Sequence, residues 1–236
     1  KIIKKSVLPK LETPAMKILL KVPIINDKIK ATVREEMIKA FGGNFREVIV
    51  GGAAFNQEVE QFLKMIDFPY TVGYGMTECG PIICSSRWET LKLASCGKAT
   101  TRMEVRIDSP DPKTHAGEIV CRGMNMMLGY YKNPEATAQI IDANGWLHTG
   151  DLGTLDEEGY VTVRGRSKNL LLTSSGQNIY PEEIESIINN FRFVNESLVV
   201  ESKGKLVAMV HFNMEELEKQ VQKIKSQAGN VERKGA

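Results

Sequence analysis

The chain has 236 residues, of which 42% are hydrophobic and 25% are charged, enough for one large domain or two modest ones. Its formal net charge of +2 argues against a dedicated nucleic-acid-binding domain, and its aliphatic content excludes an intrinsically disordered chain. No apolar run reaches the roughly 18 to 20 residues that a membrane-spanning helix requires.

The first third of the chain alternates between helical and strand patterns. Apolar residues at every fourth position from Ile29 to Phe41 predict an amphipathic helix. A short buried strand is expected at Glu47–Val50, followed by a helix capped by Asn56 and a strand at Pro69–Tyr74. This order predicts an α/β fold with a parallel sheet, in which ligands bind beyond the carboxyl ends of the strands.

The later segments have different patterns. Short alternating strands at 103–108, 117–122 and 160–164, the last preceded by a turn at 156–159, predict a small antiparallel barrel or sandwich. From Arg166 onward we expect a separate α+β module. Its expected elements are a strand at 170–172, a helix from Pro181 with Ile184, Ile187 and Ile188 on its apolar face, a hairpin at 197–200 and 206–212, and a helix at 217–224. The predicted domains are 1–165 and 166–236.

The cysteines and histidines lack the spacing of a metal site. Cys79, Cys84, Cys96 and Cys121 form no C-x-x-C pair, and the three histidines are far apart in the sequence. We therefore expect four reduced thiols in a cytoplasmic protein.

The leading segment 1–34 is basic, with nine Lys or Arg residues, two acidic residues and a net charge of +7. Two interpretations stay open. One is a solvated basic helical surface; the other is attraction to a phosphate-rich ligand or to anionic lipid headgroups, with a peripheral position at the inner membrane surface.

The run Gly73–Glu78 follows a predicted strand and carries residues suited to a nucleotide. Glycine lets the backbone approach a ligand closely, Tyr74 offers a flat face for stacking, and Thr77 offers a hydroxyl to a phosphate. Glu78 offers a hard oxygen ligand to Mg²⁺. The alternative is a tight turn at a strand end with a solvated glutamate.

Two further runs have similar alternatives. Gly145–Asp151 places an exposed aspartate at a glycine turn, suited either to both hydroxyls of a ribose or to its own backbone. The basic run Gly165–Asn169, followed by Ser174–Glu185, fits either a hinge at which Arg166 holds a ligand or a plain exposed linker.

Together and in this order, the motifs resemble the adenylate-forming superfamily of acyl-CoA synthetases, luciferases and adenylation domains. The chain looks most like bacterial long-chain fatty-acid–CoA ligases, over essentially residues 1–213. The matching segments are Val50–Ala54, Tyr74–Glu78, Gly117–Ile119, Arg122 with Gly123, Gly129 with Tyr130, Thr149–Asp151, Gly165–Lys168 and Ser175–Glu185.

The resemblance implies a fold and a set of binding residues. Residues 1–165 would be the C-terminal part of a large AMP-binding domain, with a parallel-sheet α/β portion and a small β-barrel region. Residues 166–236 would be most of a small mobile α+β domain. The residues that the resemblance places at the nucleotide are Gly51, Gly52, Ala53, Tyr74, Gly75, Met76, Thr77, Asp151 and Arg166.

The resemblance also implies individual roles. Thr77 would hold the α-phosphate, Glu78 would bind Mg²⁺, and Asp151 would bind the ribose hydroxyls with help from Arg166. Lys168 would be the hinge about which the small domain swings. Gly176 would lie near the pantetheine path of coenzyme A.

The implied reaction joins ATP and a carboxylate into an acyl-adenylate and pyrophosphate, and the thiol of coenzyme A then displaces AMP. The expected ligands are a long-chain fatty acid, ATP or AMP, Mg²⁺ and coenzyme A, with no nucleic acid. An aryl or amino acid as the substrate stays an alternative, as does a non-catalytic relative that binds AMP or an acyl-adenylate.

Two departures from the family pattern affect this interpretation. The Ser/Thr/Gly-rich phosphate loop is absent, and the C-terminal lysine that drives adenylation has no match, since Lys234 precedes its glycine. The chain also begins with Lys1 and is much shorter than the family's proteins. We therefore expect a piece of a longer ligase that by itself has little or no synthetase activity.

Overall fold

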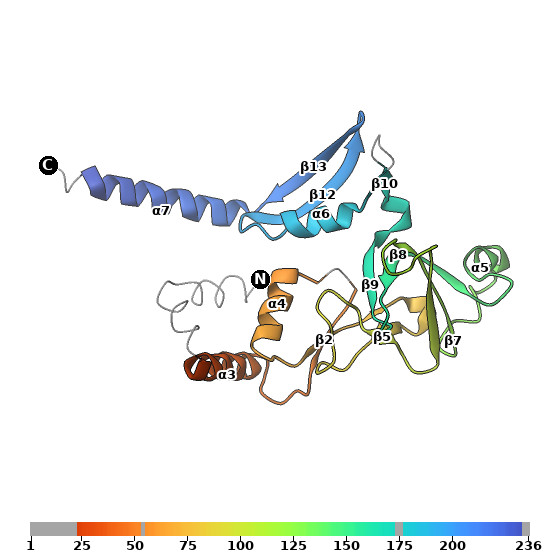
Figure 1. Ribbon diagram of the computed structural model, residues 1–236. Helices are drawn as coiled ribbons and strands as arrows, with labels where there is room; N and C mark the ends of the chain where they lie inside the picture. The colour runs from red at the N-terminus through yellow and green to blue at the C-terminus, as the bar shows by residue number, and fades with distance from the viewer. Residues whose placement is uncertain (1–22, 53–54, 173–176, 233–236) are drawn as a thin grey trace. The chain divides into compact units, whose positions relative to one another are not determined.

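The computed structural model describes residues 23–52, 55–172 and 177–232 (Figure 1). Its contacts divide the chain into two compact units, Lys1–Val163 and Arg164–Ala236, two residues before the expected domain boundary. Residues 1–22 of the basic segment, together with Ala53 and Gly176, lie outside the described residues. Within the described part, no helix is both long and apolar enough to cross a membrane.

The first unit begins with the expected helix–strand alternation. Its elements are α3 (Pro23–Ala40), β1 (Val48–Val50), α4 (Gln57–Met65) and β2 (Tyr70–Val72). β1 and β2 are parallel, and Asn56 caps α4 by accepting a hydrogen bond from the Val59 N–H at 3.0 Å. Met37 of α3 packs with Phe62 of α4 and Val72 of β2 in one core cluster. The predicted helices and the predicted parallel pair are therefore confirmed.

Two details of this region differ from the prediction. Ile49 is 64% exposed, so β1 is not a buried strand; alternate residues of a strand point to opposite faces, and its neighbours Val48 and Val50 are the half-buried ones. The strand expected at Pro69–Tyr74 divides at Gly73. The Gly73 N–H makes the last contact with β1, to the Val50 carbonyl at 2.8 Å, and the chain then joins another sheet.

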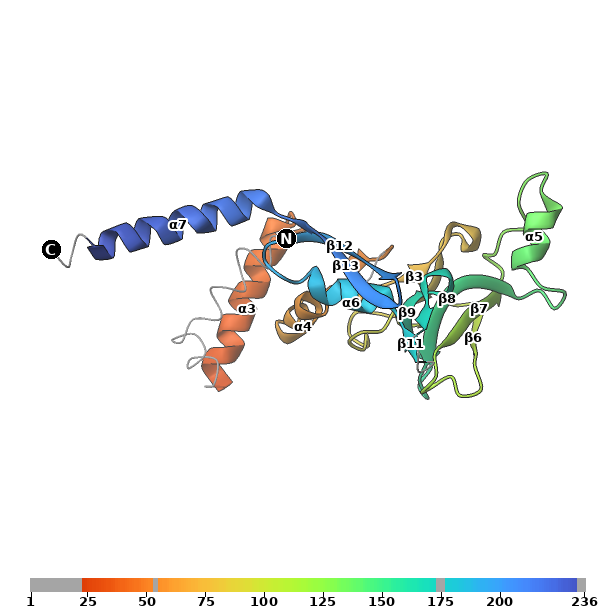
Figure 2. The same cartoon turned by 90° about the horizontal axis from the view of Figure 1, so that it is seen from above.

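The middle of the chain forms two antiparallel sheets. One has the order β3 (Tyr74–Gly75), β4 (Ile82–Ser85) and β5 (Lys98–Ala99). The other has the order β6 (Met103–Asp108), β7 (Gly117–Gly123), β8 (Leu147–Leu155) and β9 (Val161–Arg166), which lie side by side in Figure 2. Both sheets supply a second core cluster, and α5 (Pro134–Ile140) lies between β7 and β8 in the sequence. Closure into a barrel stays a prediction.

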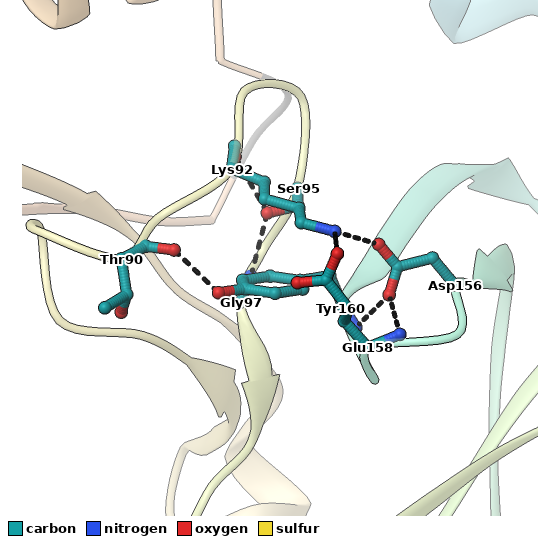
Figure 3. Close-up of polar contacts among 7 residues, drawn as sticks. All are labelled: Thr90, Lys92, Ser95, Gly97, Asp156, Glu158 and Tyr160. Atoms are coloured by element: carbon teal, nitrogen blue, oxygen red, sulfur yellow. Dashed lines mark hydrogen bonds and ion pairs between the residues drawn. The ribbon is translucent and has the colours of Figure 1, made fainter.

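The segment between β4 and β5 is attached to the turn between β8 and β9 (Figure 3). The Lys92 ammonium lies 2.8 Å from Asp156 and 2.7 Å from Glu158, and over the Tyr160 ring at 4.6 Å. The Tyr160 hydroxyl donates to the Thr90 carbonyl at 2.7 Å. The predicted turn is confirmed, because Asp156 accepts from the backbone N–H groups of Glu158 and Tyr160. These contacts hold the turn between β8 and β9 against the segment between β4 and β5.

The second unit is built around a hairpin. Its elements after β9 are a 3₁₀ turn (Ser167–Asn169), β10 (Leu171–Leu172), β11 (Asn178–Ile179), α6 (Pro181–Ile188), β12 (Val194–Ser202), β13 (Lys205–Phe212) and α7 (Met214–Glu232). β12 and β13 pair antiparallel, as predicted, and α6 is joined to β12 by Glu185, which accepts from the Val199 N–H at 2.7 Å. Ile187 was expected on the apolar face of α6 but is 63% exposed. Ile184 and Ile188 are the half-buried isoleucines of α6.

Candidate functional site

The structure joins two of the predicted motifs through Tyr74 and Asp151, which are 77 residues apart in the sequence. The Tyr74 hydroxyl, from β3, donates a hydrogen bond of 2.6 Å to the Asp151 carboxylate, from β8. Asp151 is only 7% exposed. Burial raises the pKa of Tyr74, and the hydrogen bond to Asp151 raises that pKa further. The phenol is therefore protonated at neutral pH and acts as a donor.

Asp151 does not lie at an exposed glycine turn, as the sequence suggested, but inside a bulge of β8. Val120 of β7 is opposite His148, and Glu118 is opposite Leu152. A single β7 residue between them therefore faces the three β8 residues 149–151. Bulges of this kind redirect side chains and are common beside active sites.

The turn that the sequence pattern indicated belongs to a different aspartate. Asp142 accepts hydrogen bonds from the backbone N–H groups of Asn144 at 2.8 Å and Trp146 at 2.9 Å. An aspartate that bonds its own backbone in a turn is therefore present, but it is Asp142, nine residues before Asp151. Asp151 itself lies in β8, where its carboxylate accepts from the Tyr74 hydroxyl.

Thr77 and Glu78 begin the short 3₁₀ helix Thr77–Cys79 just beyond β3. Thr77 is exposed and Glu78 is half-buried. The Tyr130 hydroxyl donates to one carboxylate oxygen of Glu78 at 2.8 Å, and the Met127 N–H donates to its backbone carbonyl at 2.7 Å. The Gly129–Tyr130 motif therefore orients the carboxylate of the Tyr74–Glu78 motif.

The turn after Gly75 leaves no room for a side chain. A Cβ atom on Gly75 would lie 1.9 Å from the carbonyl oxygen of Pro81. The same oxygen accepts a hydrogen bond of 2.8 Å from the Met76 N–H. Asn125 secures the other side of the turn, because its amide donates to the carbonyls of Cys79 at 2.6 Å and Ile82 at 2.8 Å.

The glycines after β1 lie beside the same strand end. A Cβ atom on Gly51 would approach the Gly73 carbonyl oxygen to 3.2 Å, and Gly52 has a φ of +83°, a conformation that favours glycine. Both glycines are exposed. The carboxyl ends of β1 and β2 therefore form one open backbone edge next to Tyr74.

Arg166 and Lys168 belong to the second unit, and both side chains are exposed. Within that unit, Glu182 of α6 accepts from the Arg166 N–H at 3.4 Å and from the Asn169 amide at 2.7 Å. Asp151 and the glycine loops belong to the first unit. The nucleotide roles of Arg166 and the hinge role of Lys168 stay predictions.

Three residues at this site carried no individual role in the sequence prediction. Asn125 secures the turn after β3, Tyr130 orients Glu78, and Glu118 contacts the bulge that carries Asp151. Tyr130 and Glu118 lie inside motifs that the resemblance matched, so the sequence indicated their segments but not their individual roles. Asn125 lies between such motifs, and its role depends on contacts with segments more than 40 residues away.

Comparison with known proteins shows the family of the chain. The family model described as "AMP-binding enzyme" matches residues 11–131, and the chain therefore belongs to the AMP-binding enzyme family.

Individual relatives are CoA ligases of several substrates. Over 73% of its length, the chain is 36% identical to a 3-[(3aS,4S,7aS)-7a-methyl-1,5-dioxo-octahydro-1H-inden-4-yl]propanoyl:CoA ligase of Rhodococcus jostii, and covers 37% of that protein. It is 31% identical, over 80% of its length, to the rat long-chain-fatty-acid–CoA ligase ACSBG2, and covers 28% of it.

A solved structure of an adenylate-forming enzyme also resembles this chain. The O-succinylbenzoate coenzyme A synthetase of Bacillus subtilis in complex with AMP superimposes with a TM-score of 0.65 and 30% identity, over 75% of this chain and 40% of that one. The mixed α/β fold is thus that of adenylate-forming enzymes. The chain spans about a third of the length of the curated relatives it matches.

Proposed function

We propose that this chain supplies the nucleotide-binding elements of an AMP-forming acyl-CoA ligase. The observation that carries the proposal is the hydrogen bond between Tyr74 and Asp151. It brings an aromatic ring and a shielded carboxylate together beside Thr77 and Glu78. A ring, a carboxylate, a hydroxyl and a second carboxylate are the groups that a nucleotide's base, ribose, phosphate and metal require.

In the proposed complex, adenine packs on the Tyr74 ring beside the backbone of Gly51 and Gly52. Asp151 accepts hydrogen bonds from the ribose hydroxyls, and Thr77 donates to the α-phosphate. Transfer at phosphorus depends mainly on positioning and charge stabilisation, so these residues contribute by holding the α-phosphate in line with the attacking carboxylate.

Glu78 is the residue that fits a magnesium ion. Its carboxylate is half-buried, and Tyr130 holds one of its two oxygens. Mg²⁺ in nucleotide sites needs only one or two protein carboxylates, since phosphate and water oxygens complete its shell. Among the residues that the structure describes, no group of three or more His, Cys, Asp or Glu side chains is arranged to hold a metal. When bound, the ion neutralises phosphate charge, while Glu78 fixes its position.

We propose that residues of the second unit contribute to both half-reactions. Arg166 would assist Asp151 at the ribose, and Lys168 would be the hinge about which that unit rotates. A rotating domain lets one pocket serve adenylation and then thioester formation with coenzyme A. The proposed roles of Ala53 at the nucleotide and Gly176 at coenzyme A concern residues outside the described part of the chain.

We propose a long-chain fatty acid as the acyl substrate. The match to the rat long-chain enzyme over 80% of the chain supports this choice. An aromatic acid is the second candidate, favoured by the likeness to the O-succinylbenzoate enzyme. With the product of the complete reading frame, CoA-dependent release of AMP should be faster with palmitate than with O-succinylbenzoate. The opposite order would replace the fatty acid by the aromatic acid.

The nucleotide proposal is tested by calorimetry of AMP binding to this chain. Asp151→Asn should weaken binding about tenfold, because a hydrogen bond to a charged group contributes about 1.5–3 kcal/mol. Asp108→Asn is the matched control, since Asp108 is an exposed aspartate of β6. Equal AMP affinity in the Asp151 variant and the control would refute the proposed site.

A further inference from the structure

The bulge of β8 contains backbone N–H groups that the β7–β8 hydrogen-bond ladder does not pair. Residues 149–151 face a single residue of β7, so the regular ladder cannot pair all of their N–H groups. Gly150 adopts a φ of +71° at the centre of the bulge. Because buried backbone N–H groups need partners, some other group must accept from this segment.

Glu118 is the side chain that accepts. One of its carboxylate oxygens takes the Gly150 N–H at 2.9 Å, and the other lies 2.7 Å from Nδ1 of His148. The next residue of β7 also binds the bulge, because the Ile119 carbonyl accepts from the Thr149 hydroxyl at 2.7 Å. That hydroxyl in turn accepts from the Asp151 N–H at 3.1 Å.

Every residue of the bulge is therefore fixed by the pair Glu118–Ile119, and the bulge is what aims Asp151 at Tyr74. Both oxygens of Glu118 are used, and its side chain is 29% exposed, so its hydrogen bonds are partly shielded from water. Hydrogen bonds to an ionised carboxylate are stronger than neutral ones.

We propose that Glu118 is a positioning residue for the ribose end of the nucleotide, acting through Gly150 to hold Asp151. The inference rests on the proposed function, because it takes Asp151 as the ribose ligand. Glu118 itself touches no substrate. Its effect should therefore depend on whether the nucleotide has ribose hydroxyls.

The experiment compares two ligands, AMP and 2′,3′-dideoxy-AMP, which lacks both hydroxyls that Asp151 would bind. Calorimetry on this chain gives the affinity of each variant for both. Glu118→Ala should weaken AMP about tenfold and leave the dideoxy ligand within about twofold. Glu118→Gln keeps an oxygen acceptor for the Gly150 N–H and should restore most of the AMP affinity.

The control variant is Glu104→Ala, which removes a β6 carboxylate paired with Arg122 and should change neither affinity. Asp151→Asn shows whether the difference between AMP and dideoxy-AMP depends on Asp151. If Asp151→Asn weakens the affinity for AMP but not for dideoxy-AMP, and Glu118→Ala does not, the positioning role of Glu118 is wrong while the proposed function stands. If it weakens both ligands equally, the ribose role of Asp151 fails and the inference fails with it.

Thermal unfolding checks that each variant is folded. Should Glu118→Ala not fold, His148→Ala removes the other partner of the Glu118 carboxylate and should weaken AMP about threefold, again without changing dideoxy-AMP. Unchanged AMP affinity in that variant would overturn the proposal.

Discussion

Replacing Gly75 by alanine should disrupt the turn that presents Thr77 and Glu78. The added Cβ atom would lie 1.9 Å from the Pro81 carbonyl oxygen, whereas ordinary contacts begin near 3.4 Å, so backbone must move by about 1.5 Å. The same oxygen accepts from the Met76 N–H at 2.8 Å, and a displacement of that size breaks this bond.

The expected change in the free energy of unfolding is the sum of these two effects. Overpacking against backbone costs roughly 1–3 kcal/mol, and the lost hydrogen bond adds about 1 kcal/mol. Gly75→Ala should therefore lower the free energy of unfolding of the first unit by about 2–4 kcal/mol.

A neighbouring glycine provides the control. A Cβ atom on Gly73 would meet its nearest neighbours at 3.7–3.8 Å, which is ordinary contact, so Gly73→Ala should be neutral or stabilise by up to about 1 kcal/mol. Urea unfolding followed by tryptophan fluorescence suits the comparison, because both tryptophans, Trp88 and Trp146, lie in the first unit. Equal midpoints for the Gly75 and Gly73 variants would refute the reasoning.

Three further predictions concern side chains that the fold buries or caps. Burial and the hydrogen bond to Asp151 raise the pKa of Tyr74, so the stability that depends on its proton is complete below about pH 10, the unfolded value, and is lost as the pH rises above it. Tyr74→Phe should reduce the fall in unfolding free energy above about pH 10, measured by urea titration; an unchanged slope would contradict this. Burial raises the pKa of Cys84 to about 12 and that of Cys96 to about 11, so a thiol reagent at about pH 8 should label both only after unfolding. Rapid labelling of the native chain would show that these thiols are accessible. Asn56→Ala should cost about 1 kcal/mol through loss of the α4 cap, while Asn56→Ser should retain most of the stability; equal loss in both variants would argue against a capping role.

The sequence by itself determined the elements whose signals are local. The helix capped by Asn56 was predictable because the capping residue, the apolar spacing and the end of the helix lie within about ten residues of one another. The turn at Asp156 was predictable for the same reason. The order of the motifs was also readable, and it indicated the family to which residues 11–131 were matched.

Only the tertiary structure decided how distant segments meet. The exposed faces of Ile49 and Ile187 depend on which element packs on each side, and apolar pattern alone does not specify this.

The candidate site depends on the same kind of information. Asp151 looked like a turn residue because glycines surround it in the sequence. Its actual place in a strand follows from the register between β7 and β8, and from the Glu118 side chain 32 residues before Gly150. Alternation within a strand indicates which side chains share a face, but it does not locate a register shift such as the one between Glu118 and Val120 of β7, which appears only when the two strands are paired. The contact between Tyr74 and Asp151 exists for that physical reason.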